Sequence, residues 1–234
     1  MKRITSFPTL TEQAYSTIRE SICDGTLAPG THLVQEELAV RLGVSRQPVQ
    51  QAMALLRSDG LVVESAGRGL HVAPVDPELM AYRYQIRRVL DRLAAELVAR
   101  RAAASSVFAD DLRTLGAEVL AAGNAAVAAG NHREAVQQDV RFHSLIYGMS
   151  GNPLLPGSAE PHWSYLRRVM TGVLIETERG PLIWLQHREI LGLLAGGDVE
   201  GAVEAVTVHV SGAEAALREK LNESQGELSM VDGP

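Results

Sequence analysis

Two short amphipathic segments lie almost end to end near the N-terminus, and their spacing restricts the fold more than any other feature. The first, QEELAVRL at 35–42, places its leucines on one face of a helix. The second is expected to begin at Ser45, a residue type that caps helices well, so that Gly43 and Val44 separate the two. Helices joined this tightly must cross at a steep angle, which is the arrangement of a helix-turn-helix.

The elements around this pair predict a winged helix-turn-helix. Apolar residues at helical spacing indicate a preceding helix over 11–24, and Gly60 ends the third helix after Asp59. Two β-prone runs, LVVE and LHVA, follow and are joined by the glycine-containing turn SAGRG. Three short helices and a hairpin in this order predict a DNA-binding domain over 8–75.

The sequence changes character at Pro77, where long helical segments replace the short elements. Helices separated by turn-forming stretches such as AAGN, ERGP and AGGD are expected at about 78–103, 107–129, 132–148, 161–178, 182–195 and 199–222. We divide this part of the chain into a linker at 76–80, a helical domain at 81–223 and a flexible tail at 224–234. The fold class is therefore mainly α, with a winged helix-turn-helix followed by an all-helical antiparallel bundle.

Composition and charge limit the class of protein. Hydrophobic residues make up 46% of the 234 residues and aromatic residues 4%, which suits helices packed on small side chains and disfavours an all-β fold. We expect a cytoplasmic protein without membrane association, because the N-terminus lacks the apolar run of a signal peptide, no stretch is long enough to span a bilayer, and Cys23 is the lone cysteine.

The net charge of −6 is unevenly distributed. Up to Val75, seven Lys or Arg residues face seven Asp or Glu residues, whereas fifteen face twenty-one from Asp76 onward. Because DNA-binding proteins usually carry an overall basic surface, net charge does not support nucleic-acid binding here. The case for such binding depends on local arrangement.

The third helix presents a polar face opposite its apolar one. Its core side consists of Val49, Ala52, Met53 and Leu56, and its polar side of Arg46, Gln47, Gln50 and Arg57. Arginine can bind guanine through O6 and N7, and glutamine can bind adenine through N6 and N7. Taken alone, this face is also typical of a solvated surface. Arg68 at the hairpin tip shifts the interpretation toward DNA, because the minor groove attracts arginine.

The run PGTHLVQEELAVRLGVSRQPVQQAMALLRSDGLVVESAGRGLHVAPV resembles the DNA-binding domain of the GntR superfamily of bacterial transcription regulators. The shared pieces are PG before the second helix, LGVSR across the turn, PV in the third helix, DGL at its end and GRG in the hairpin. Many relatives carry Arg-Glu where this sequence has Gln50 and Gln51, so we expect its own operator preference and a weaker dependence on salt. The resemblance implies DNA contacts from Ser45, Arg46, Gln47, Arg68 and Gly69.

Four residues of the helical half form a candidate metal site. Asp139 and His143 are four residues apart and share one helical face, although such pairs are also common on helix surfaces. His187 and His209 lie in apolar stripes of separate helices, where a buried histidine is more often a core residue than a ligand. Three such histidines and a carboxylate together favour metal binding. This setting is absent around His32, His71, His132 and His162.

The helical half resembles the FCD ligand-binding domain of the FadR branch of the same superfamily, through its DVRFH, SGNPLL and LAGGD motifs and a histidine in the last helix. The resemblance implies that Asp139, His143, His187 and His209 hold a divalent metal ion. Such a set suits zinc first, with nickel, cobalt or manganese as alternatives. It also implies that Arg87 binds the effector, against the alternative of a surface arginine, and that Asp91 stands where relatives often have Glu.

The leading hypothesis is a homodimeric transcription regulator. We expect it to repress from a palindromic double-stranded DNA operator, while a small carboxylate effector bound in the helical domain alters operator affinity. One alternative is a metal sensor in which the ion is the signal. Another is a metal-dependent hydrolase that activates water at an open metal position. The sequence shows no obvious general base, phosphate loop or nucleophile elbow, so we expect no enzymatic activity.

Overall fold

The computed structural model describes residues 8–65, 69–173 and 180–231. The chain divides into two compact units, which meet in sequence at Val75 and Asp76. No helix in these three ranges is both long enough and apolar enough to cross a membrane.

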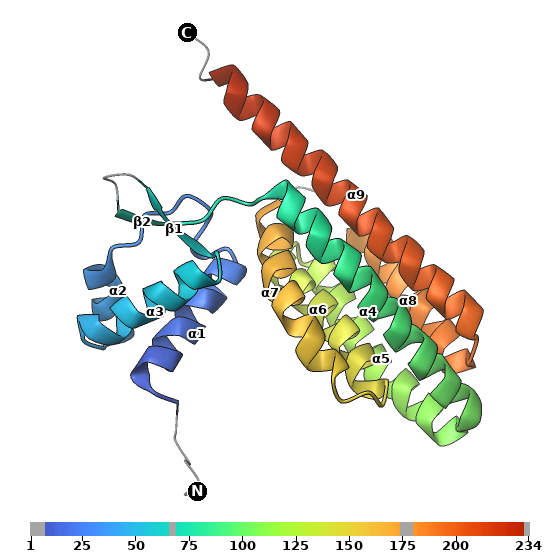
Figure 1. Ribbon diagram of the computed structural model, residues 1–234. Helices are drawn as coiled ribbons and strands as arrows, with labels where there is room; N and C mark the ends of the chain where they lie inside the picture. The colour runs from blue at the N-terminus through green and yellow to red at the C-terminus, as the bar shows by residue number, and fades with distance from the viewer. Residues whose placement is uncertain (1–7, 66–68, 174–179, 232–234) are drawn as a thin grey trace, which may run out of the picture. The chain divides into compact units, whose positions relative to one another are not determined.

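The first unit is a winged helix-turn-helix (Figure 1). Its elements are α1 (Leu10–Cys23), α2 (Gln35–Leu42), α3 (Arg46–Ser58), β1 (Val62–Ser65) and β2 (Gly69–Val72). The two strands are antiparallel, with Val62 opposite Val72. One apolar core joins all three helices to the hairpin, and its most buried members include Ile18, Val49, Leu56 and Val72. The predicted elements of this unit are confirmed.

The tight turn between α2 and α3 depends on Gly43. This residue is the C-cap of α2 and has a left-handed backbone with φ of 68°, which side chains with a Cβ rarely adopt. Ser45 occupies the N-cap position of α3 with an extended backbone, but its side chain makes no capping hydrogen bond. The expected position of the cap is thus correct, while the side-chain contact is missing.

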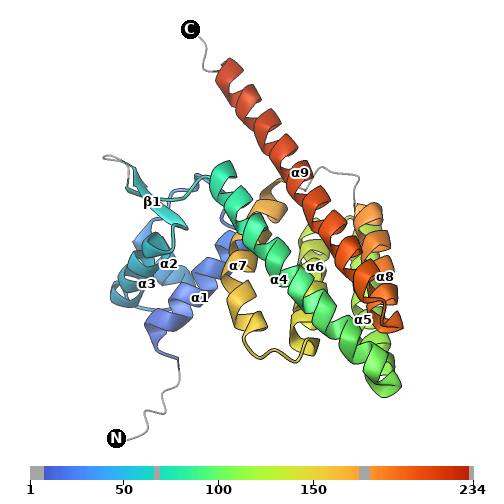
Figure 2. The same cartoon turned by 45° about the vertical axis from the view of Figure 1, so that its right-hand side comes forward.

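The second unit is a helical bundle, in which α4 and α9 lie side by side (Figures 1 and 2). Its helices are α4 (Pro77–Ala104), α5 (Ser106–Ala128), α6 (His132–Met149), α7 (Leu155–Val173), α8 (Gly180–Gly196) and α9 (Val199–Val231). Helix α5 packs against both α6 and α8. Close approach to α8 requires glycine, because a Cβ at Gly123 would lie 2.0 Å from the Trp184 ring.

The proposed linker at 76–80 is too long, because α4 already begins at Pro77. The Asp76 side chain accepts hydrogen bonds from the N–H groups of Glu78 and Leu79, and proline is favourable in the first helical turn. The Tyr165 hydroxyl of α7 also hydrogen-bonds to the backbone of Asp76, donating to its carbonyl at 3.0 Å. Asp76 is therefore fixed to the helical unit.

Two other boundaries differ from the expected ones. Helix α7 begins at Leu155 rather than 161, within the stretch SGNPLLPGS that was expected to be a break between helices. The Asn152 side chain accepts a hydrogen bond from the N–H of Leu154 and so favours a helix start here. Pro161 consequently lies inside α7. Helix α9 continues to Val231 instead of ending at 222, so most of the predicted tail at 224–234 is helical. The helix extends beyond the rest of the bundle (Figure 2).

Candidate metal centre and nucleic-acid interface

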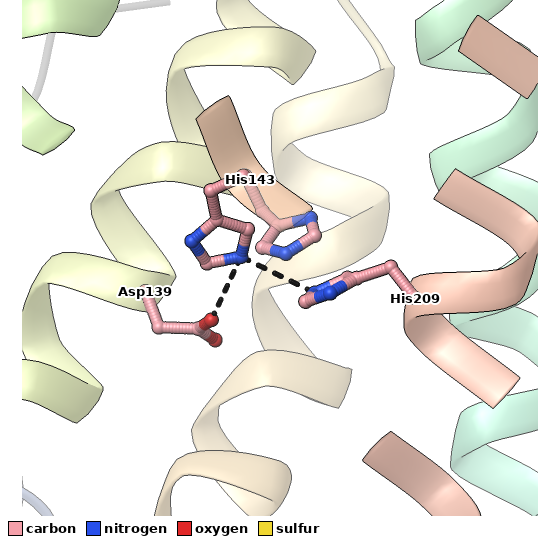
Figure 3. A group of neighbouring side chains, drawn as sticks. Asp139, His143 and His209 are labelled. Carbon is pink, nitrogen blue, oxygen red and sulfur yellow. Dashed lines mark hydrogen bonds and ion pairs between the residues drawn. The ribbon is translucent and has the colours of Figure 1, made fainter. Parts of the chain in front are cut away.

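The structure brings together the four predicted metal ligands inside the bundle. Asp139 and His143 lie one turn apart on α6, His187 comes from α8 and His209 from α9. All four are buried, and one potential ligand atom from each lies within 4.8 Å of the others. Figure 3 shows the labelled side chains of Asp139, His143 and His209 pointing toward one another.

The donor atoms at this point fit a cation. The Nε2 atom of His187 lies 3.2 Å from Asp139 Oδ1 and 3.2 Å from Nε2 of His209. Asp139 Oδ2 is buried without a hydrogen-bond partner among the described residues. Three imidazoles and a carboxylate form a ligand set for zinc and neighbouring divalent metals, with positions left for water or another oxygen ligand. When bound, such an ion would act as a Lewis acid toward that additional ligand.

Polar groups behind the histidines orient their rings. The Nδ1 atom of His209 lies 3.0 Å from the amide oxygen of Gln186. Because this oxygen can only accept a hydrogen bond, Nδ1 carries the proton of the neutral ring and Nε2 is unprotonated. His143 Nδ1 lies 3.5 Å from Asp91 Oδ2, an ion-pair distance without a hydrogen bond in this structure. Metal-binding histidines are commonly held by carboxylates or amides through the second ring nitrogen. The ring of His187 instead stacks on Phe142, with centroids 4.2 Å apart.

Arg87 is buried beside this cluster rather than exposed. Its Nε donates to Asp91 Oδ2 at 3.1 Å, and its Nη2 lies 3.0 Å from Nε2 of His143. Because a guanidinium can only donate, His143 Nε2 must be the acceptor. The guanidinium also lies over the Trp163 ring, 3.8 Å from its centroid. The alternative of a surface arginine does not hold, and Arg87 contacts a predicted metal ligand directly.

The electrostatic environment keeps these groups in the ionisation states that metal binding needs. Burial disfavours the Asp91 carboxylate, but His143 and Arg87 outweigh it and lower its pKa to about 2. The pKa of Asp139 is lowered in the same way, mainly through its hydrogen bond from His187. Burial lowers the pKa of His187 and lowers the pKa of His209 much further. At neutral pH the carboxylates are charged, whereas these two imidazoles are neutral.

Several residues around the centre were missed from sequence. Tyr84, Arg87 and Asp91 follow helical spacing and share the buried face of α4, a pattern that could have linked Tyr84 to the site. The indole N–H of Trp163 donates to the Tyr147 hydroxyl, which in turn donates to Asp91. Contacts between separate helices of this kind leave no periodic signal in a single sequence.

The predicted DNA-contacting residues of α3 lie on its exposed side. Those near its start are Ser45, Arg46, Gln47 and Gln50, all exposed. Arg57 lies in the last turn, where it forms an exposed ion pair with Glu64 of β1 at 3.1 Å. Gln51 accepts a hydrogen bond from the Thr11 hydroxyl of α1 at 2.7 Å, so the two adjacent glutamines differ in role. Gln50 remains available at the surface.

The predicted wing residues are only partly described. Arg68 lies outside the described residues. Gly69 is the first residue of β2 and has φ of 81°, and a Cβ there would lie 2.8 Å from Nε2 of His32. Glycine is therefore required at this position by both backbone conformation and space.

Comparisons with known proteins match both units. Residues 10–72 match the family described as bacterial regulatory proteins, gntR family, and residues 83–212 match the FCD domain. An uncharacterised HTH-type transcriptional regulator in an unstable DNA locus of Streptomyces ambofaciens is 30% identical over 201 residues, covering 84% of this chain and 80% of the relative. The HTH-type transcriptional repressor RspR of Escherichia coli is 26% identical over 208 residues, covering 89% of each chain.

Solved structures agree with these matches. A GntR-type transcriptional regulator from Rhodococcus sp. RHA1 superposes with a TM-score of 0.74 at 25% identity, covering 88% of this chain and 96% of its own. McbR/YncC of Escherichia coli superposes with a TM-score of 0.76 at 21% identity, covering 92% of this chain and 100% of its own, which supports the fold.

His143→Ala and His209→Ala should each lower the metal content of the purified protein, measured by mass spectrometry after dialysis. A site filled at about 100 times its dissociation constant adds about 2.7 kcal/mol of stability. Its loss should lower the Tm by about 5–10 °C, at roughly 2–4 °C per kcal/mol. His162→Ala, which removes a half-buried histidine of α7 outside the cluster, is the control. Unchanged metal stoichiometry in both ligand variants would contradict the site.

Asp91→Asn should reduce metal affinity by about 10–100-fold, because it removes the carboxylate behind His143 while preserving side-chain shape. Affinity is measured by competition with a chelating dye, after circular dichroism has verified folding. Glu96→Gln, on the exposed side of the same helix, is the matched control. Equal affinities for Asp91→Asn and Glu96→Gln would show that Asp91 does not position His143.

Proposed function

Because the chain belongs to the GntR family of bacterial transcriptional regulators and carries an FCD domain, we propose that it is a homodimeric repressor whose helical domain binds a divalent metal ion and a small organic acid. It is a DNA-binding regulator and not an enzyme. The observation that carries the proposal is the buried four-ligand cluster with Arg87 beside it. Its proposed action on DNA supports a location in the bacterial cytoplasm.

A metal sensor is the second candidate function. It is favoured by the four-ligand cluster alone, since a buried ion can supply folding free energy and alter helix packing without any organic ligand. The two candidates respond differently in an electrophoretic mobility shift with DNA from upstream of the gene. Chelator alone should change the shift for a metal sensor, whereas an organic acid should change it for the proposed repressor.

Two exposed residues near the start of α3, Arg46 and Gln50, are suited to different parts of DNA recognition. Arg46 is highly exposed and only loosely paired, with Nη1 4.0 Å from Glu36 Oε2, so its guanidinium can bind guanine or phosphate. Gln50 faces outward one turn later and suits adenine. The side-chain oxygen of Gln51 instead accepts a hydrogen bond from Thr11 of α1. We therefore assign base recognition to Gln50, and both base recognition and general DNA affinity to Arg46.

An exposed apolar seam on α4 supports homodimer formation. Five large side chains follow one another at alternating steps of three and four residues, the spacing of a coiled-coil contact. They are Leu79, Tyr82, Ile86, Val89 and Leu93, with exposed fractions of 37%, 53%, 48%, 64% and 39%. A second copy of the chain would cover this α4 seam with the same residues, as two-fold symmetry requires.

Helix α4 also suggests how the effector changes DNA binding. Its buried face carries Arg87 and Asp91 at the candidate metal centre, while the α4 seam lies on its outer face. Its first residue, Pro77, follows directly after the DNA-binding unit in the chain. A ligand that prefers one packing of α4 would shift the pair of DNA-binding units toward one spacing. Repression would then end when that spacing no longer matches the operator.

Arg46→Ala and Gln50→Ala should affect operator binding differently. Removing Arg46 eliminates a cation and a base contact, so both specific and non-specific affinity should fall and the salt dependence should weaken. Removing Gln50 should lower the free energy of discrimination at one base pair by about 1–3 kcal/mol and leave non-specific affinity nearly unchanged. Fluorescence anisotropy with operator and scrambled duplexes at several salt concentrations measures both effects. Equal, sequence-independent losses from the two variants would refute this assignment.

Val89→Asp should dissociate the dimer. An unpaired charge buried at an interface costs about 3–5 kcal/mol, which corresponds to at least about a 100-fold weaker dimer at 1.4 kcal/mol per tenfold. Analytical ultracentrifugation of the full chain measures the dissociation constant. Val107→Asp is the matched control, because Val107 is a similarly exposed valine on α5 outside the α4 seam. A dimer that is equally stable in both variants would place the interface elsewhere.

A further inference from the structure

A cavity of about 330 Å³ adjoins the candidate metal centre and has mostly apolar walls. Residues of α5, α6, α7 and α8 form these walls, and Asp139 of α6 is one of them. Its main apolar walls are Val127, Val136, Met170, Ile183 and Trp184. The volume lies at the lower end of the range for small-molecule sites. This apolar chamber suits a compact molecule with a hydrophobic body.

The indole of Trp184 forms a fixed wall of the apolar chamber. It is buried against α5 at Gly123, where a Cβ would overlap the ring, and it meets the His187 ring edge-on at 4.8 Å between centroids. Of the candidate metal ligands, Asp139 lines the apolar chamber, and the Trp184 ring gives the chamber an aromatic wall. A flat or branched apolar group would pack against this surface.

A second, smaller cavity of about 40 Å³ lies on the α4 side of the same centre. It shares Asp139, Met170 and Ile183 with the apolar chamber, so the two cavities are neighbours on either side of these residues. Its volume admits only one or two groups of the size of water. Its walls are mostly apolar, but Tyr84 and Arg87 also line it, and we call it the polar cavity after these two side chains.

Two buried donors in the polar cavity lack partners among the described residues, namely Arg87 Nη1 and the Tyr84 hydroxyl. Burial raises the pKa of Tyr84 to about 12, so the phenol keeps its proton at neutral pH and can donate. An unsatisfied buried donor costs free energy and suggests a ligand that accepts hydrogen bonds. A guanidinium and a phenol together suit the two oxygens of one carboxylate.

We propose that the effector is a monocarboxylate with a single compact apolar body, aromatic or branched aliphatic. Its carboxylate binds Arg87 and Tyr84 in the polar cavity beside the metal position, and its apolar body fills the apolar chamber. This inference deepens the proposed function, since it rests on the helical domain binding an organic acid. It names Tyr84 as a second anion-binding residue and Trp184 as the surface that selects the apolar body.

Charge balance also favours a monoanion. Among the groups in contact at the centre, Asp91 and Asp139 are negative and Arg87 is positive, which leaves one net negative charge. A divalent ion changes this to one net positive charge, and one carboxylate restores neutrality. A second carboxylate would have to enter the apolar chamber, where burial of an unpaired charge is costly. Besides Asp139, the ionisable residue among those that line the chamber is the exposed His132.

The experiment is isothermal titration of the zinc-loaded full chain, without DNA, with five acids that chelate zinc weakly. Benzoate and 3-methylbutanoate carry apolar bodies, acetate carries almost none, succinate has a second carboxylate and gluconate has hydroxyl groups. Benzoate and 3-methylbutanoate should bind at least tenfold more tightly than the other three. Tighter binding of succinate or gluconate, or no binding of any of the five acids, would overturn the inference.

Two variants assign the parts of the effector to the two cavities. Ala135→Phe places a ring in the apolar chamber and should reduce benzoate affinity to that of acetate, whereas Ala125→Phe, at an exposed position of α5, should not. Tyr84→Phe should weaken acetate and benzoate by the same several-fold factor with little change in Tm. If Tyr84→Phe weakened neither acid, or Ala135→Phe kept the preference for benzoate, the assignment would be wrong.

The regulator function is tested separately by mobility shift with upstream DNA. If succinate or gluconate bound and released DNA, the proposed function would stand and the present inference would fall. If benzoate bound tightly in the calorimeter but the protein did not shift DNA at low salt, the effector class would stand and the proposed function would fail.

Discussion

The helical unit depends on a group of ionisable side chains enclosed in an apolar bundle. Burying charge is costly unless partners compensate it, and here Arg87 and Asp91 pair at 3.1 Å while both are almost fully buried. Their pairing fixes one face of α4 against α6, where His143 touches both residues. The metal-ligand geometry, the polar cavity and the position of α4 all follow from this arrangement.

A single helix connects the parts of the proposed mechanism. The inner face of α4 bears Arg87, the proposed effector-binding residue, and its outer face bears the α4 seam. An ion pair between Arg88 and Glu214, at 2.5 Å, also ties α4 to α9. Because packed helices move as rigid units between discrete arrangements, a small change at Arg87 can alter how two copies of α4 meet.

The sequence predicted the architecture well because each element carries a local signal. The helix-turn-helix follows from Gly43 and from apolar spacing. The four candidate metal ligands, which the structure brings together, could be named because a family resemblance supplied what one helix face could not. The early start of α7 was missed because Asn152 and Pro153 were read as a break, although they also suit a helix start. Tyr84 could have been linked to the site by its spacing to Arg87 and Asp91 on α4, whereas Gln186 and the two cavities could not be found, since they arise where separate helices meet.

The contact between Arg87 and His143 gives the order in which metal and acid would bind in the proposed mechanism. His143 Nε2 offers one lone pair, which accepts from Arg87 Nη2 at 3.0 Å and which a metal ion would also need. An ion bound there would release Nη2, adding a second donor to the unpartnered Nη1 of the same guanidinium. Two parallel N–H groups bind a carboxylate far better than one. In the proposed mechanism, acid affinity would therefore depend on prior metal binding, with the organic acid as the signal and the metal as its precondition.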